Sequence, residues 1–180
     1  MAQRKKRADA VHNRERIVAA ATDAIAEDGP SVSLERIARL AEVGPGTLYR
    51  HFPTRDELLA AVFAGRISAL CDQARRFSER HDPREALHRW VVTMLDHTMT
   101  DNGLLEALAL SGSKPEIDCS ARVLEAASSL LDHAQDAGTT RSDLTPDDLL
   151  RLVIGLGRAT DDRSQARRLL NVMLDGTIVA

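Results

Sequence analysis

The chain has 180 residues, which is enough to bury one or two hydrophobic cores, because a domain of roughly 150 residues buries about 70% of its unfolded surface. It has no run of 18 apolar residues, and its two cysteines, Cys71 and Cys119, form no CxxC pattern and follow no secretory signal, so we expect a cytoplasmic protein with reduced thiols and no membrane span. Residues 1–66 carry 11 Lys and Arg against 9 Asp and Glu, whereas residues 67–180 carry 13 against 18, which favours a polyanionic partner at the N-terminal end only.

The N-terminal end is the most basic part of the chain. Its first 16 residues hold six basic side chains and two acidic ones. We interpret residues 1–9 as a basic arm, which would enter a DNA minor groove or raise non-specific affinity for DNA. Basic tails also often serve solubility alone.

Apolar residues recur at helical spacing along nearly all of the chain, and no alternating run of four to eight residues indicates a strand. The predicted fold class is therefore all-α, with about nine helices. A first helix is expected over about residues 11–27, a second over residues 33–40 with Ser33 as its cap, and a third over residues 45–51. Two short helices joined by a tight turn give the outline of a helix-turn-helix.

Three later helix starts carry capping signals, at Thr54, Asp82 and Thr145. The helix from Thr54 keeps one apolar stripe for about seven turns, which is long enough to leave one small domain and enter another. The helix from Asp82 is expected to end near residues 101–103, with a shorter apolar segment after it.

The last two helices carry apolar residues on more than one face, whereas a surface helix needs an apolar stripe on one side only. Gly155 and Gly157 would permit close backbone approach. We favour a second subunit as the partner of this apolar area, with deep burial inside one subunit as the alternative. The predicted dimer interface consists of Leu149, Leu152, Val153, Leu156, Leu169, Leu170 and Met173.

The region around the turn matches a longer pattern, formed by Ile37, Ala38, Gly46, Thr47, Leu48, Tyr49, Arg50, His51, Phe52 and Arg55. This pattern resembles the DNA-binding signature of the TetR family of bacterial transcriptional regulators. Two positions depart from it, because many relatives have Gly where Glu42 stands and Ser where Gly44 stands. The resemblance implies a helix-turn-helix DNA-binding domain at residues 1–53 and a ligand-binding and dimerisation domain at residues 54–180.

Side chains of the third helix divide into an inner and an outer set. Leu48 and Phe52 are expected to face inward against Ile25, Ile37 and Leu40, which closes a three-helix core.

The resemblance implies contacts with a palindromic operator in double-stranded DNA. Thr47 would lie near base edges, and phosphate contacts would come from Tyr49, His51 and Arg55. Arg50 is expected to read a base, because Arg reaches guanine O6 and N7 with two hydrogen bonds, with a phosphate contact or a salt bridge as alternatives.

Three further residues are expected at the same interface. By the same resemblance, Ser33 would contribute a backbone contact from the second helix. Pro45 and Gly46 carry little side chain, so they would let the protein backbone at the start of the third helix approach the DNA closely.

For the C-terminal domain the resemblance covers architecture only. Its candidate pocket residues are Trp90, Met94, His97, Leu105, Leu108 and His133, although helically spaced Trp and Met more often belong to a core. Enzyme motifs and clustered metal ligands are lacking in the sequence, so we predict no enzyme, cofactor or metal site. Arg75 lies one turn after Cys71, which is too weak a signal to predict a redox sensor, and a redox role of Cys71 or Cys119 is left open. The predicted function is a homodimeric repressor that a small-molecule effector releases from its operator. The alternatives are a helical protein-interaction module and a ligand-independent DNA-binding regulator.

Overall fold

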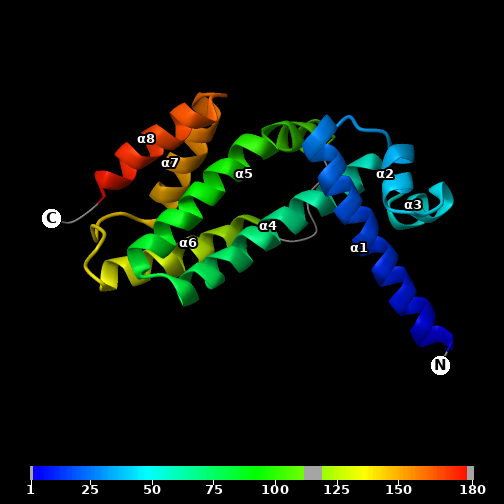
Figure 1. The fold of residues 1–180 in the computed structure, drawn as a ribbon, viewed down its shortest axis with the longest axis horizontal. Helices are drawn as coiled ribbons and strands as arrows, with labels where there is room; N and C mark the ends of the chain where they lie inside the picture. Colours follow the sequence, from blue (N-terminus) through cyan, green and yellow to red (C-terminus); the bar gives the residue numbers. More distant parts are fainter. Residues whose placement is uncertain (1, 112–118, 178–180) are drawn as a thin grey trace. The chain divides into compact units, whose positions relative to one another are not determined.

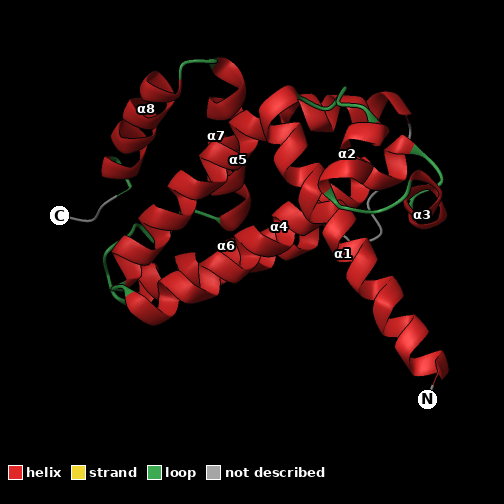
Figure 2. Ribbon diagram, turned by 45° about the vertical axis from the view of Figure 1, so that its right-hand side comes forward, coloured by secondary structure: helices red, strands yellow, loops and turns green. Residues whose placement is uncertain are grey.

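The computed structural model describes the backbone of residues 2–111 and 119–177 and the side chains of residues 9–101 and 119–177. Within these residues every regular element is an α-helix (Figures 1 and 2), which confirms the predicted all-α class. The helices are α1 (Ala2–Asp28), α2 (Leu34–Leu40), α3 (Pro45–His51), α4 (Arg55–Arg80), α5 (Pro83–Ser111), α6 (Cys119–Asp136), α7 (Pro146–Ala159) and α8 (Arg163–Asp175).

Two helices differ from the expectation. α1 begins at Ala2, so the segment expected to form a basic arm is helical, in keeping with the high helix propensity of Ala, Gln, Arg and Lys. α5 continues through Gly103, where the sequence predicts an end, because a glycine inside a helix weakens it by about 1 kcal/mol without breaking it. The described residues therefore hold eight helices where about nine are expected.

The predicted capping side chains hold the helix starts. In each case a side-chain oxygen accepts a hydrogen bond from the backbone N–H three residues later, which satisfies a donor that has no partner inside the helix. The donor–acceptor distances are 3.1 Å for Ser33 and Arg36, 3.2 Å for Thr54 and Glu57, 3.0 Å for Asp82 and Glu85, and 3.1 Å for Thr145 and Asp148.

The chain forms two compact units. The first contains α1 to α3, the start of α4 through Gly65, and the end of α5 from Gly103. The second contains the rest of α4 and α5 together with α6, α7 and α8. The boundaries fall inside α4 and α5, so both of these helices contribute to both units.

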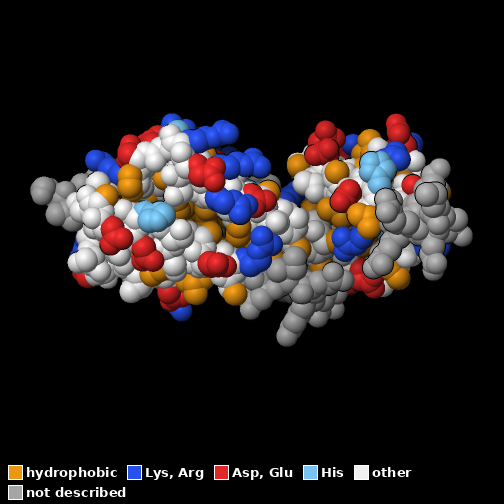
Figure 3. Space-filling view, turned by 90° about the horizontal axis from the view of Figure 1, so that it is seen from below, with side chains coloured by type: hydrophobic (Ala, Val, Ile, Leu, Met, Phe, Trp, Pro, Cys, Tyr) orange, Lys and Arg blue, Asp and Glu red, His pale blue; other side chains and the backbone are white. Residues whose placement is uncertain are grey.

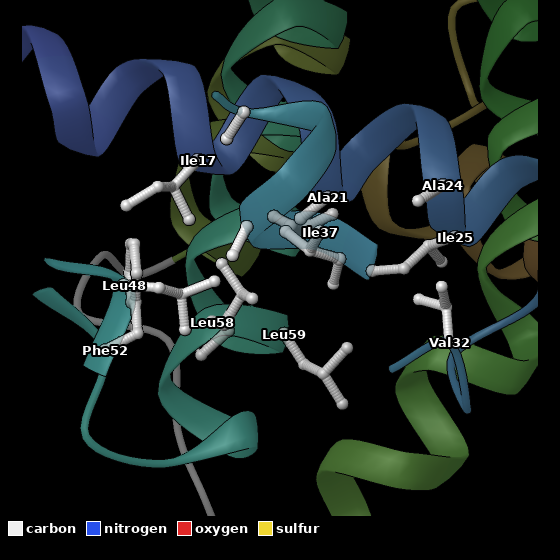
Figure 4. Close-up of a cluster of buried hydrophobic side chains, with 14 residues drawn as sticks. Ile17, Ala21, Ala24, Ile25, Val32, Ile37, Leu48, Phe52, Leu58 and Leu59 are labelled. Carbon is white, nitrogen blue, oxygen red and sulfur yellow. The ribbon is translucent and has the colours of Figure 1, made fainter. Parts of the chain in front are cut away.

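The core of the first unit is assembled from four helices (Figure 4). Ile17, Ala21 and Ile25 of α1 are buried together with side chains of α2, α3 and α4. Leu40 is an exception to the expected inner set, since 52% of its surface is exposed. The inward stripe of α2 consists of Ile37 and Ala38 and continues to Ala41, the residue that caps the end of the helix, and Leu40 lies outside it.

The second unit is centred on Trp90 of α5, which is fully buried and donates its Nε1–H to the backbone oxygen of Leu70 at 3.0 Å. α7 packs against α5 at Gly157, where an added Cβ would lie 2.7 Å from Cγ2 of Thr98. The same test at Gly155 finds no atom within 4 Å. The close approach expected from these glycines is thus made by Gly157 alone, and it is made inside the subunit.

The contact between α7 and α5 generates a prediction. Gly157→Ala should lower the free energy of unfolding by about 1–3 kcal/mol, because the new methyl group overlaps the Thr98 side chain. Thr98→Ser removes the overlapping Cγ2 but keeps the hydroxyl that donates to the Met94 backbone oxygen at 3.0 Å. In the Gly157→Ala background this second change should restore part of the stability, measured by urea unfolding, because the Cβ of residue 98, 3.0 Å from the added Cβ, remains. A loss that Thr98→Ser leaves unrepaired would contradict this packing.

Candidate nucleic-acid interface

α3 is held in place by the two side chains that the sequence assigns to the core. Leu48 and Phe52 are 1% and 2% exposed, which confirms that they face inward. The helix begins at Pro45 after Gly44, which offers no side-chain cap. Proline at the first helical position is pre-set for a helix and lacks only an N–H that would have no partner there. The start of α3 is therefore almost free of side-chain bulk.

The other side chains of α3 form the outward face. Gly46, Tyr49 and Arg50 are exposed, with 45% of Tyr49 accessible, and Thr47 and His51 are half-buried. Arg50 donates its Nε–H to the backbone oxygen of Gly46 at 3.1 Å, so its side chain lies along its own helix. The face thus presents one phenol, one guanidinium and little else beyond backbone.

Arg55 has a different place from the one expected. Its Nη1 donates to the backbone oxygen of Pro30 at 2.8 Å and its Nη2 to that of Val32 at 2.7 Å. The half-buried guanidinium thereby ties the loop between α1 and α2 to the start of α4. Because both terminal nitrogens serve the fold, we do not retain Arg55 as a phosphate contact. Ser33 is exposed, and its hydroxyl serves as the cap of α2.

Two arginines of α1 that the sequence interpretation did not single out lie next to α3 and the turn before it. The guanidinium carbon of Arg14 lies 5.0 Å from the centre of the Phe52 ring. Arg16 forms an ion pair with Glu42 at 2.8 Å. A helical spacing of three places Arg14 one turn before the core residue Ile17, which is the signal that could have indicated this position.

The turn between α2 and α3 is a Schellman motif, in which Glu42 N–H donates to Arg39 O at 3.1 Å and Val43 N–H to Ala38 O at 3.0 Å. Its central residue, Glu42, has φ = 50°, a left-handed conformation that usually falls to glycine. For a residue with a Cβ this conformation costs about 1–2 kcal/mol. An exposed ion pair such as that with Arg16 contributes about 0–1 kcal/mol, so it does not clearly offset the strain.

The candidate pocket residues do not converge. Trp90 and Met94 are buried core residues of the second unit. His97 lies with its Nδ1 3.6 Å from Oδ2 of Asp101, which is itself buried and paired with Arg66. Leu105 and Leu108 lie outside the residues whose side chains are described.

His133 alone among the described candidates lines a groove. This groove of about 440 Å³ lies between α4 and α6, and His133 contacts Ser78 across it at 3.3 Å. Its lining mixes charged, polar and apolar groups and comprises Cys71, Asp72, Ala74, Arg75, Ser78, Glu79, Arg122, Glu125, Ala126, Ser129, Leu130 and His133. Figure 3 shows one face of the molecule, on which acidic and basic side chains lie interspersed with hydrophobic ones.

The predicted dimer residues divide in two. Leu149, Val153 and Leu170 are fully buried inside the subunit, so they are not available to a partner and this part of the prediction is wrong. Leu152 and Leu169 are 46% and 44% exposed.

Three further side chains complete this picture. Leu156 and Met173 are half-buried, and Val172, which the predicted interface omits, is 66% exposed. A second groove of about 590 Å³ is lined by residues of α7, of α8, of the loop before α7 and of the segment directly after α8, and it includes Leu152 and Val172.

The thiols and acidic groups offer little for other chemistry. Burial raises the pKa of the Cys71 thiol, which donates to the Arg122 backbone oxygen at 3.5 Å, so the reactive thiolate is disfavoured. Among the described residues no three potential ligands lie together to hold a metal ion. None of the described helices is both long enough and apolar enough to cross a membrane.

Comparisons with known proteins bear on both units. A family model described as bacterial regulatory proteins of the tetR family matches residues 17–62, and one described as the SbtR-like transcriptional regulator C-terminal domain matches residues 82–178. The TetR transcriptional regulator SCO0520 from Streptomyces coelicolor is 37% identical, with 93% of this chain and 99% of that chain covered and a TM-score of 0.79. A TetR transcription regulatory protein from Mycobacterium vanbaalenii is 35% identical over 96% and 99% of the two chains, with a TM-score of 0.78.

A curated relative extends the comparison. The HTH-type transcriptional regulator SAB2452 from Staphylococcus aureus is 28% identical over 110 residues, which span 60% of this chain and 60% of that protein. All of these matches are described as regulators, in agreement with the prediction that the chain is not an enzyme. Residues 17–62, which contain α2 and α3, are thus a DNA-binding helix-turn-helix, and the chain belongs to the TetR family of bacterial transcriptional regulators.

Proposed function

We propose that the protein is a homodimeric repressor that leaves a palindromic operator when a small-molecule effector binds its second unit. The observation that carries this proposal is the path of α4. This helix starts at Arg55, shortly after the DNA-facing helix α3 ends, and its later turns line the groove against α6. An effector in that groove would contact α4. The first turns of the same helix carry Leu58 and Leu59, which are buried in one hydrophobic cluster with Leu48 of α3.

The groove lining supports an effector that carries polar groups as well as apolar surface. Arg75 and Arg122 offer donors, Asp72 and Glu125 offer acceptors, and His133 can serve as either. Such a mixture suits a compound with hydroxyl, carboxylate or amine groups better than a purely apolar one.

Dimerisation would join two helix-turn-helix units on one duplex. Helix-turn-helix dimers need half-sites about 34–36 Å apart, so a movement of a few ångströms in α4 would be enough to misplace one unit. Exposed Leu152, Leu169 and Val172 on α7 and α8 offer the apolar surface for the second subunit.

The dimer surface is tested by Val172→Glu. A charge at this 66% exposed position should convert a dimer into a monomer at micromolar concentration, because an unpaired carboxylate would be buried between subunits. Leu124→Glu is the matched control, since Leu124 is also exposed, at 40%, but lies on α6. Sedimentation velocity gives the masses, and a Val172→Glu protein that stays dimeric would refute this interface.

Arg50 and Arg55 are predicted to give opposite results. Arg50→Ala should leave stability unchanged but weaken binding to duplexes selected by the wild-type protein by about tenfold, with little change for random duplex. Arg55→Ala should lower the free energy of unfolding by about 2 kcal/mol, because it removes two charge-assisted hydrogen bonds. Urea unfolding and fluorescence anisotropy with both duplexes distinguish them. An Arg50→Ala protein that loses both duplexes equally would argue against base reading.

Effector coupling is tested with a metabolite library. A compound that raises the melting temperature of the wild-type protein should also release a fluorescent selected duplex. Arg75→Ala should abolish both effects because Arg75 lines the groove, whereas Arg84→Ala, an exposed arginine of α5 outside the groove, should retain them. Stabilisation without release would favour the ligand-independent regulator instead.

A further inference from the structure

The turn that precedes α3 contains a strained acidic residue. Glu42 is, among the described residues, the one position other than glycine with a positive φ, and its hydrogen-bond pattern is one that glycine normally completes. Its side chain is 84% exposed, so hydrophobic burial does not explain its presence. Backbone strain that no stabilising contact clearly offsets is found mainly at functional sites.

The carboxylate of Glu42 pairs with Arg16 of α1 at 2.8 Å. The Arg16 side chain is 33% exposed, so its guanidinium lies at the surface and is accessible to a competing anion. Arg14, on the same helix, lies against Phe52 at the other end of α3. The two arginines therefore stand near the start and the end of the helix that faces DNA, and Glu42 neutralises one of them.

DNA phosphates would meet this arrangement when α3 approaches a duplex. A DNA phosphate is attracted by Arg16 and repelled by Glu42. To pair with Arg16, the phosphate must displace the Glu42 carboxylate, so the ion pair weakens binding of the DNA backbone. We propose that Glu42 competes with DNA phosphate for Arg16, and thereby lowers the affinity of the helix-turn-helix for duplex of any sequence. Arg16 is, in this view, a phosphate-binding side chain that the protein itself keeps partly occupied.

Competition of this kind has a quantitative signature. Each phosphate that a protein neutralises releases counterions and steepens the dependence of log K on log salt by about 0.9. Freeing Arg16 should therefore add about one unit to that slope and tighten binding most at low salt. Random-sequence duplex is the appropriate probe, because its binding is essentially all electrostatic.

The test compares two charge-matched variants on a random 30-base-pair duplex, by fluorescence anisotropy over a series of salt concentrations. Glu42→Gln keeps the size of the side chain and removes its charge, and it should bind about threefold to tenfold more tightly at low salt with a slope steeper by about one unit. Glu27→Gln removes an equally charged, exposed glutamate that pairs with Arg36 at 3.3 Å at the far end of α1. This control should bind as the wild-type protein does.

Two further variants separate the causes. Arg16→Ala in the Glu42→Gln background should abolish the gain in affinity. Glu42→Gly should show the same gain and, because glycine accepts the left-handed conformation, also a higher melting temperature than Glu42→Gln.

The inference is overturned if Glu42→Gln and Glu27→Gln bind alike, or if the gain survives Arg16→Ala. A wild-type protein that shows no salt-dependent binding to any duplex would instead remove the DNA-binding assignment itself, and this inference with it.

Discussion

Burial of Leu48 and Phe52 is the contact on which the DNA-binding unit depends. α3 has only seven residues, and isolated helices shorter than about 12–15 residues are marginal in water. Its helical form must therefore come from packing, and fully burying side chains of this size contributes roughly 1.5–3 kcal/mol each. Because these two anchors fix the orientation of α3, the residues between and before them acquire fixed directions too, including Tyr49 and Arg50.

Local signals in the sequence predict local structure well. Ser33, Thr54, Asp82 and Thr145 mark helix starts because a capping bond joins residues only three apart, and the structure confirms all four. The two differences between expectation and structure lie where the sequence has no strong helix stop signal. α1 extends back to Ala2 through residues of high helix propensity, and α5 continues through Gly103 because one glycine weakens a helix without ending it.

Side-chain roles that depend on distant partners are the part that the sequence does not reveal. Arg55 occupies the expected position in the family pattern, but its hydrogen-bond partners lie 23 and 25 residues earlier in the chain. In α7, Leu149 and Leu152 have the same chemistry in the sequence, but only the placement of neighbouring helices buries the first and exposes the second. Periodicity shows that a helix has apolar faces, and it does not show which neighbour covers each one.

The aromatic residues have a practical consequence. The chain has one tryptophan and one tyrosine, and they fall in different units: Trp90 is sealed in the core of the second, whereas Tyr49 stands exposed on α3. Excitation of the indole therefore samples the environment of the second unit, and the phenol reports on the exposed face of α3 in the first. Without any label, the molecule carries a separate optical reporter for each of its two units.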